Sequence, residues 1–238
     1  MTDPTVVLVH GAFADASGWG GVVRELQHRG LDVLAPPNPL RGLGSDADAV
    51  GAFVAAIEGP VLLVGHSYGG AVITRAATEL PGVVGLVYVA AFGLDEGETV
   101  LSVQEPFPPT MLAQSARPSA YPAPGAAGGP DLFIDHDLFR ETFCADLPAD
   151  QAEVLFATQR PVAAATLGEP LDRTPAWRDR PSWYLVSRHD RTIDPATEAF
   201  MAQRMGATTE TIDGSHLAFV SRPVAVAGFI GSAVAKLA

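Results

Sequence analysis

Short apolar runs that alternate with helical segments constrain this chain more than any other feature. The runs are four to eight residues long and rich in β-branched residues, and they comprise Thr5 to Val9, Asp32 to Ala35, Val61 to Val64, Val83 to Ala90, Trp183 to Val186 and Thr208 to Ile212. Such runs are typical of strands buried on both faces. Apolar residues recur at helical spacing between them, as in Trp19, Val22, Val23 and Leu26. Strands alternating with helices predict an α/β fold, in which helices cover both faces of a mostly parallel sheet.

Capping residues and prolines predict where three helices begin. Ser45 or Asp46 is predicted to cap a helix that ends near Glu58. Pro195 fits the first turn of a later helix, and the last helix is predicted to follow Pro223. The chain shows no repeat with a period of about 20 to 50 residues, which argues against solenoids and propellers.

The alternating pattern stops between about residue 95 and residue 180. Seven prolines lie between Pro106 and Pro130, so this stretch cannot form a central strand or an unbroken helix. Later residues suggest short amphipathic helices, namely Leu138, Phe143, Val154, Leu155 and Phe156. We therefore predict a single domain, residues 1–238, in which 1–94 and 181–238 form the core and about 95–180 form an inserted lid. A loop without a role remains the alternative for residues 106–130.

Charge and cysteine content narrow the classes of partner. Acidic residues outnumber basic ones by 27 to 15, and a net charge of -12 disfavours binding to nucleic acid or to anionic membranes. A small-molecule substrate is therefore the expected partner. The single cysteine, Cys144, cannot form a disulfide within the chain, and the first residues lack a basic stretch followed by a long apolar one, so we expect a cytoplasmic location.

The segment Gly65-His66-Ser67-Tyr68-Gly69 fills the pattern G-x-S-x-G between a predicted strand and a predicted helix. A serine in that position sits on a strained turn that exposes its hydroxyl at the end of a sheet, and flanking glycines let neighbouring backbone pass closely. The sequence therefore predicts that Ser67 is a nucleophile.

A serine nucleophile needs a histidine that accepts its proton. His216 directly follows the last predicted strand, in the turn from Asp213 to His216, where its side chain can reach back toward Ser67. His66 belongs to the turn around the serine and is predicted to point away from it. We assign no catalytic role to the remaining histidines, which are His10, His28, His136 and His189.

The histidine in turn needs a carboxylate that fixes its tautomer and stabilises its charged form. Asp190 follows the run from Trp183 to Val186, so it is predicted to lie at the same edge of the sheet as His216. Asp194 and Asp95 are rivals. Asp194 can instead cap the helix that starts at Pro195.

A tetrahedral intermediate also needs hydrogen-bond donors for its oxyanion. The segment His10 to Phe13 directly follows the first predicted strand. The predicted oxyanion hole consists of the backbone N–H groups of Ala12 and Tyr68. We expect His10 to brace this loop by hydrogen bonding rather than to react.

Together these motifs resemble the α/β-hydrolase superfamily, and within it the branch of small esterases and hydroxynitrile lyases that includes plant methylesterases. The resemblance is carried by Val7 to Phe13, Val64 to Gly70, Ser187 to Asp190 with Pro195 five residues on, and Gly214 to His216. It covers nearly the whole chain, and the spacing of acid and proline favours Asp190 over Asp194. The order Ser67, Asp190, His216 is the order of that superfamily.

The resemblance implies hydrolysis of small carboxylic esters through an acyl-enzyme, without a metal or an organic cofactor. The best-known lyases of the branch carry a lysine next to the catalytic histidine and a threonine after the first-loop histidine. Those positions are Leu217 and Gly11 here, as in the esterases. The alternatives are a lyase, a lactonase or a C–C bond hydrolase with the same triad, or a small-ligand receptor of hydrolase descent. Lid residues that could line an apolar pocket are Phe133, Phe139, Phe143, Phe156 and Trp177.

Overall fold

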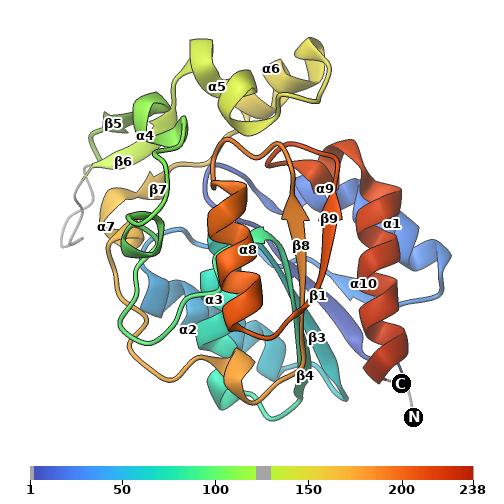
Figure 1. The fold of residues 1–238 in the computed structure, drawn as a ribbon. Coiled ribbons are helices and arrows are strands. Elements are labelled where there is room, and N and C mark those ends of the chain that lie inside the picture. The colour runs from blue at the N-terminus through green and yellow to red at the C-terminus, as the bar shows by residue number, and fades with distance from the viewer. Residues whose placement is uncertain (1–2, 122–129, 238) are drawn as a thin grey trace.

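The computed structural model describes residues 3–121 and 130–237 (Figure 1). Its larger sheet has six strands, and they are β1 (Thr5–Val9), β2 (Val33–Leu34), β3 (Val61–Ser67), β4 (Val83–Ala91), β8 (Ser182–Ser187) and β9 (Thr208–Ile212). The helices associated with it are α1 (Gly20–His28), α2 (Leu43–Ala55), α3 (Tyr68–Ala76), α8 (Pro195–Arg204), α9 (Ala218–Ser221) and α10 (Pro223–Leu237). Each predicted strand is present, so the apolar runs located the sheet correctly.

The strands are arranged in the order β2-β1-β3-β4-β8-β9, and every neighbouring pair is parallel. Figure 1 shows α1 and α10 on one face of this sheet and α2, α3 and α8 on the other. The carboxyl ends of the strands point toward the segment that carries α5 and α6. The predicted α/β fold with a parallel sheet is confirmed, and the loops after its strands meet at one edge.

Burial differs between the central and the edge strands. Every residue of β3 is buried, whereas Leu34 of β2 is 41% exposed and the first four residues of β9 are exposed. The prediction that all the runs are buried on both faces is therefore wrong for β2 and β9. An edge strand has a neighbour on one side only, so less of its surface is covered.

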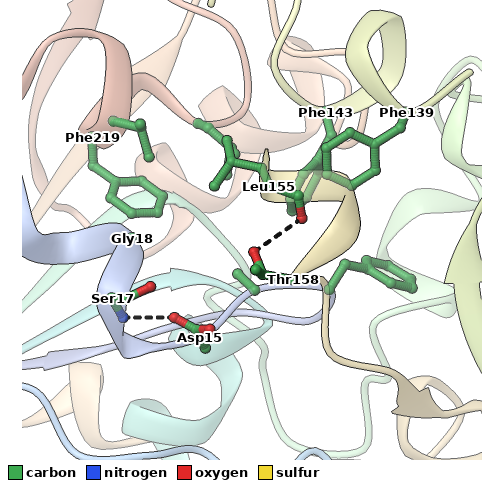
Figure 2. A pocket seen from close by; sticks show the side chains of 12 residues that line it. Asp15, Ser17, Gly18, Phe139, Phe143, Leu155, Thr158 and Phe219 are labelled. Carbon is green, nitrogen blue, oxygen red and sulfur yellow. Dashed lines mark hydrogen bonds between the residues drawn. The ribbon is translucent and has the colours of Figure 1, made fainter. Parts of the chain in front are cut away.

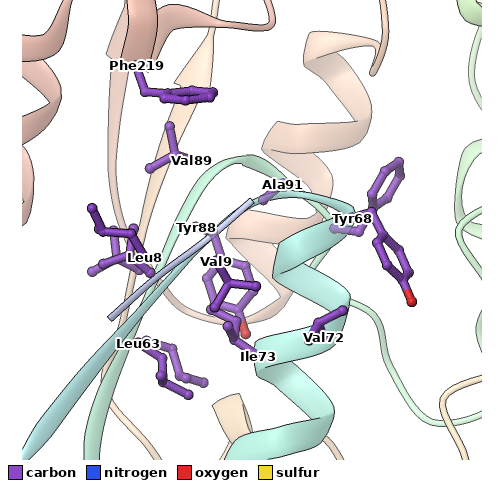
Figure 3. Packing of buried hydrophobic residues seen from close by; sticks show 14 of the residues in the cluster. Leu8, Val9, Leu63, Tyr68, Val72, Ile73, Tyr88, Val89, Ala91 and Phe219 are labelled. Atoms are coloured by element: carbon purple, nitrogen blue, oxygen red, sulfur yellow. The ribbon is translucent and has the colours of Figure 1, made fainter. Parts of the chain in front are cut away.

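Apolar side chains pack between the sheet and α3 at the centre of the fold (Figure 3). Val9 and Leu63 from the strands and Ile73 from α3 are fully buried in one apolar cluster. Tyr88 of β4 carries a hydroxyl into this layer, and its Oη lies 2.8 Å from Thr74 Oγ1 of α3. Because buried hydroxyls need partners, this bond lets a tyrosine sit inside the layer.

Helix starts agree with the sequence in two cases and differ in one. α8 and α10 begin at Pro195 and Pro223 as predicted. α2 begins earlier than expected, at Leu43, and ends at Ala55 rather than near Glu58, so the prediction that Ser45 or Asp46 caps it is wrong.

The cap of α2 comes from a distant part of the chain. The Glu169 carboxylate accepts hydrogen bonds from the N–H groups of Leu43 and Gly44, each at 2.8 Å. These are two of the donors that a helix leaves unpaired at its N-terminus. No local pattern signals a cap that is 126 positions away in the chain.

The segment between β4 and β8, called the cap here and counted as residues 95–180, carries a second sheet of three antiparallel strands in the order β5-β6-β7. Its elements are α4 (Leu112–Ser115), β5 (Ala116–Ser119), β6 (Asp131–Ile134), α5 (His136–Phe143), α6 (Ala149–Ala157), β7 (Val162–Ala163) and α7 (Ala164–Leu167). Short 3-10 helices complete the described chain at Ala16–Trp19, Ala77–Glu79, Ser102–Gln104 and Ala176–Arg178.

The cap partly matches its prediction. The expected short helices are present as α5 and α6, but the sequence did not predict the small sheet, whose strands have at most four residues each. Pro118 lies in β5, an edge strand, where a proline breaks no ladder on the open side. Part of the proline-rich stretch, residues 122–129, lies outside the described residues. None of the helices that the structure describes is long and apolar enough to cross a membrane.

Candidate active site

Ser67 ends β3 and directly precedes α3, so it lies on the sharp turn from strand to helix. Its backbone has φ 53° and ψ -126°, a conformation that residues with a Cβ rarely adopt. The Ser67 carbonyl accepts a hydrogen bond from Phe92 N–H at 3.0 Å, which ties the turn to the end of β4. The strained turn expected for G-x-S-x-G is present.

Two glycines let the backbone around Ser67 come unusually close. A Cβ on Gly11 would lie 2.6 Å from the Ser67 Cβ and 2.8 Å from the His66 carbonyl oxygen. A Cβ on Gly69 would lie 2.9 Å from the His10 carbonyl oxygen. Because real Cβ atoms do not approach this closely, the loop after β1 can lie against the serine turn only with glycine at both positions.

His216 and Asp190 lie in neighbouring loops at the carboxyl ends of β9 and β8. His216 Nδ1 is 2.5 Å from Asp190 Oδ2, and both side chains are fully buried. Asp190 Oδ1 accepts further hydrogen bonds from Thr192 N–H at 2.7 Å and Ile193 N–H at 2.9 Å. The carboxylate is thus held by three donors and can fix the imidazole with Nδ1 protonated.

The other ring nitrogen of His216 is left available. Nε2 is buried and has no hydrogen-bond partner in the described part of the chain. The His216 ring packs on the ring of His66, with centroids 4.5 Å apart, and His66 Nε2 donates to the His216 carbonyl at 3.0 Å. His216 therefore contacts the residue that directly precedes Ser67. Burial, followed by the neighbouring His216, lowers the pKa of His66, which keeps His66 neutral.

The rival acids are engaged elsewhere. Asp194 is the N-cap of α8 and accepts a hydrogen bond from Ala196 N–H at 2.8 Å. Asp95 accepts two hydrogen bonds from Arg178, at 2.6 and 2.8 Å. Of the three candidates, only Asp190 contacts a histidine at the end of the sheet.

The remaining histidines take part in other contacts. His189 pairs with Asp213 at 2.7 Å and His136 with Glu153 at 3.0 Å, both on the surface. His28 lies exposed at the end of α1. In the described part of the chain, none of these three side chains forms a hydrogen bond with Asp190 or His216.

The loop after β1 is braced by His10. Its Nδ1 donates to the Gly11 carbonyl at 2.9 Å, and its Nε2 accepts from Asn38 N–H at 2.9 Å. Burial lowers the pKa of His10 to about 4, so the ring is neutral at physiological pH. Both ring nitrogens are used, as expected for a structural histidine.

The two predicted oxyanion donors directly follow the two residues that approach closely, Gly11 in the loop after β1 and Ser67 at the end of β3. Ala12 is buried, and its N–H makes no hydrogen bond within the described residues. Tyr68 is the first residue of α3, so its N–H has no partner inside the helix. The helix N-terminus also favours negative charge at this point.

The sequence missed the residue that anchors Tyr68. Tyr68 Oη donates to Asp46 Oδ2 at 2.8 Å, and Asp46 also accepts a hydrogen bond from Arg41 N–H. Burial raises the pKa of Asp46 despite these bonds. The sequence predicts Asp46 only as a possible helix cap. An acidic residue close to a helix start does not indicate a bond to Tyr68, which lies 22 positions away.

A second buried carboxyl, which the sequence also missed, lies behind Asp190. Glu198 on α8 is fully buried, and its Oε2 accepts a hydrogen bond from Ser187 N–H at 3.1 Å. Its Oε1 has no hydrogen-bond partner among the described residues. Burial and then the charge of Asp190 raise the pKa of Glu198 well above its ordinary value. Three donors surround the Asp190 carboxylate, whereas Ser187 N–H alone donates to Glu198, and this difference together with burial favours the neutral form of Glu198.

An apolar pocket lies between the loop after β1, the cap helices and the loop that follows His216 (Figure 2). Its aromatic and aliphatic lining comprises Phe13, Phe139, Phe143, Leu155, Leu217, Phe219 and Val220. The pocket encloses about 20 Å³, room for about one water molecule. Of the lid aromatics named from the sequence, Phe139 and Phe143 line it, while Phe133, Phe156 and Trp177 do not.

In residues 3–121 and 130–237, no group of three or more His, Cys, Asp or Glu side chains could hold a metal ion.

Comparisons with known proteins cover nearly the whole chain. The model of the alpha/beta hydrolase family matches residues 6–229. A protein of Aspergillus novofumigatus named alpha/beta hydrolase nvfD is 26% identical over 99% of this chain and 98% of its own length. The pyrethroid hydrolase of Sphingobium wenxiniae is 27% identical over 94% of this chain and 85% of its own length. The solved structure of a methylesterase from Arabidopsis, at 17% identity, covers 98% of this chain and 99% of its own chain with a TM-score of 0.81, so the likeness to plant methylesterases holds for the fold.

Proposed function

Because this chain belongs to the alpha/beta hydrolase family, we propose that it hydrolyses small carboxylic esters with Ser67 as nucleophile, His216 as general base and acid, and Asp190 as the carboxylate that orients the histidine. The observation that carries the proposal is the buried His216, whose Nδ1 is held by Asp190 at 2.5 Å while Nε2 stays unpartnered beside the strained serine turn. Relatives named as hydrolases and a methylesterase with the same fold support it.

The proposed reaction has two steps. Ser67 Oγ attacks the ester carbonyl carbon while His216 Nε2 takes the hydroxyl proton, and the alcohol leaves with that proton as the acyl-enzyme forms. Water then attacks the acyl carbon while His216 Nε2 takes one of its protons. The bond from Ser67 Oγ to the acyl carbon breaks, His216 returns that proton to Ser67 Oγ, and the carboxylic acid is released. The Asp190 carboxylate stabilises the imidazolium in both steps.

The N–H groups of Ala12 and Tyr68 are proposed to bind the oxyanion of each tetrahedral intermediate. Each such donor contributes about 3 to 4 kcal/mol of transition-state stabilisation in serine hydrolases. The bond from Tyr68 Oη to Asp46 supports this role, because it fixes the first residue of α3. No step needs a metal or an organic cofactor.

Ester hydrolysis is preferred over cyanohydrin cleavage on two contacts. Leu217, at the position where the lyases of the branch carry lysine, is buried against the apolar pocket and offers no charge for a cyanide leaving group. Gly11, at the position of their threonine, has no room for a Cβ next to Ser67. A lactonase or a C–C bond hydrolase with the same triad remains an outcome of the test below.

The domain division and the location of the protein also remain proposals. We propose one domain in which the core comprises 1–94 and 181–238 and the cap forms a lid over the active site, supported by the position of α5 and α6 above the strand ends (Figure 1). Residence in the cytoplasm is supported by the single, buried Cys144.

A chain-length series of p-nitrophenyl esters, assayed with the wild type and with Ser67→Ala, tests the proposed function, with mandelonitrile cleavage measured in parallel. We expect turnover of short-chain esters and a loss on the order of 10⁶-fold in kcat for Ser67→Ala. A folded wild type that hydrolyses none of the esters, or a Ser67→Ala variant that keeps its activity, contradicts the proposal. Mandelonitrile cleavage without ester hydrolysis would identify a lyase.

A further inference from the structure

One short segment of the cap, residues 142–146, contacts both loops that carry the proposed acid and base. The Thr142 carbonyl accepts a hydrogen bond from Thr192 Oγ1 at 2.9 Å, two residues after Asp190. The Phe143 ring packs on the His216 ring, with centroids 5.2 Å apart. Thr142 and Phe143 are the last two residues of α5, so the C-terminal end of that helix lies against the loops that carry Asp190 and His216.

Asp146 makes the polar contact to the histidine loop. It lies half-buried between α5 and α6, where Oδ1 accepts a hydrogen bond from Ser215 Oγ and Oδ2 accepts one from Ser221 Oγ at 2.6 Å. Ser215 directly precedes His216, and Ser221 ends the helix α9 that follows it. One carboxylate therefore holds the loop on both sides of the histidine.

The carboxylate of Asp146 is ionised in this position. Partial burial acts to raise the pKa of Asp146, but the hydrogen bonds from Ser215 and Ser221 outweigh burial and lower it. Hydrogen bonds to an ionised acceptor are shorter and about twice as strong as neutral ones. The two bonds from Ser215 and Ser221 therefore hold Asp146 against the histidine loop, although Asp146 is only half-buried.

The turn that carries His216 is crowded as well as tied. A Cβ on Gly214 would lie 2.8 Å from the Ala218 Cβ and 3.5 Å from Asp146 Oδ2. Asp190 holds the imidazole through Nδ1, and His66 holds the main chain of His216 from the core side. Asp146 supplies the matching restraint from the cap side.

We propose that Asp146 is a positioning residue through which the cap fixes the place of His216 relative to Ser67, an inference that depends on the proposed triad. The physical reason is the steep cost of misplacement, since a shift of about 1 Å in a reacting group can lower the rate about 100-fold. The cap is then part of the catalytic geometry as well as a cover over the substrate.

The test compares Asp146→Ala and Asp146→Asn with a matched control, Asp150→Asn, which changes an exposed carboxylate at the start of α6. Each variant is assayed for kcat and KM on a short p-nitrophenyl ester and for the rate at which a small fluorophosphonate inactivates it by reaction with Ser67. The midpoint of thermal unfolding is measured alongside. Inactivation reports the serine and histidine pair even where the natural substrate is unknown.

We expect Asp146→Ala to lower kcat and the inactivation rate together, by about 10- to 100-fold, with KM changed less than about threefold. Asp146→Asn keeps hydrogen-bonding atoms at both positions, and the serine hydroxyls can turn to accept from its amide, so it should recover most of that loss. Asp150→Asn should match the wild type in kcat, in KM and in the inactivation rate.

Two results overturn the inference. A kcat and an inactivation rate for Asp146→Ala within about twofold of wild type, even at a lowered unfolding temperature, mean that the contact only attaches the cap. A rise in KM without a fall in the inactivation rate means that Asp146 acts on substrate binding.

Further variants keep the inference testable if Asp146→Ala fails to fold. Ser215→Ala and Ser221→Ala each remove one hydrogen bond and leave the carboxylate, and each should lower the inactivation rate, whereas unchanged rates in both overturn the inference. A wild type that reacts with the fluorophosphonate but hydrolyses no ester contradicts the proposed substrate class and leaves the role of Asp146 to the inactivation rates.

Discussion

In the centre of the sheet, β1, β3 and β4 bury nearly all of their side chains, whereas the cap contacts the core through charged and polar side chains in addition to buried aromatic ones such as Phe143. Arg41 of the core pairs with Asp131 of the cap at 2.7 Å, Glu169 caps α2, and Asp146 binds the serines around His216. Apolar burial is non-directional and proportional to area, so it stabilises the sheet without depending on a single atom. Hydrogen bonds are directional, so the cap's contacts fix geometry at the strand ends.

This comparison predicts that changes at the polar strand ends act on the rate, while changes inside the sheet act on folding. Among the changes that test this comparison, Asp190→Asn has the largest expected effect, a fall in kcat of about 10⁴-fold, because the amide holds His216 in the wrong tautomer. Asp194→Asn is the matched control, since the Asp194 side chain caps α8 by accepting a hydrogen bond from Ala196 N–H. Steady-state hydrolysis of a short ester checks both. An Asp190→Asn variant with nearly wild-type kcat would transfer the role to another acid.

Inside the sheet, Leu63→Ala should lower the free energy of unfolding. It should leave the kcat of the folded fraction unchanged. Leu63 is fully buried in β3, and truncation of such a leucine costs about 2 to 5 kcal/mol of unfolding free energy. Leu101→Ala, in the cap and 53% exposed, should change that free energy by less than about 0.5 kcal/mol. Urea unfolding measures both, and equal costs would remove the distinction between the two regions.

An intermediate cost in unfolding free energy is expected at the N-terminus of α2, where the Glu169 carboxylate accepts two backbone hydrogen bonds. Glu169→Gln leaves one oxygen and turns an amide NH₂ toward the second backbone N–H, so it should cost about 1 to 2 kcal/mol. Glu105→Gln, at an exposed residue of the cap, is the control. The same urea titration applies. A cost for Glu169→Gln no larger than that of its control would mean that this contact does not stabilise α2.

The last expected effect depends on pH and concerns Glu198. Its pKa is higher in the folded protein than the ordinary value of 4.5, so the folded state keeps a proton that the unfolded chain releases. The free energy of unfolding therefore falls as pH rises above about 4.5, by at most on the order of 1 kcal/mol per pH unit, until the folded protein also loses the proton.

Glu198→Gln removes the titrating carboxyl group, since glutamine stays neutral. The contribution of this group to the pH dependence of the unfolding free energy is then lost. The gain in unfolding temperature of Glu198→Gln over wild type should increase from about pH 5 to about pH 8. Thermal unfolding at a series of pH values measures it, with Glu198 facing the negative Asp190 and Asp194 in the wild type. A difference that does not change with pH would mean that Glu198 is not the neutral partner of Asp190.

Much of the fold followed from the sequence because strands and helices have local periodicities. The six runs located the parallel sheet, and Pro195 and Pro223 marked two helix starts. The exposure of β2 and β9 did not follow, because a run of apolar residues does not say how many neighbours its strand has. The small sheet of the cap did not follow either, since its strands are too short for a periodicity to appear.

For the site, the sequence by itself determined the strained turn at Ser67, since a serine between glycines at a strand-to-helix junction is a local pattern. It also named Asp190, His216, Ala12 and Tyr68 as candidates. Only the tertiary structure decided which acid contacts the histidine, and it added two carboxyl groups beside the proposed triad, those of Glu198 and Asp146. Those contacts join residues far apart in the chain, and burial and charge at a point in space depend on every element that packs there.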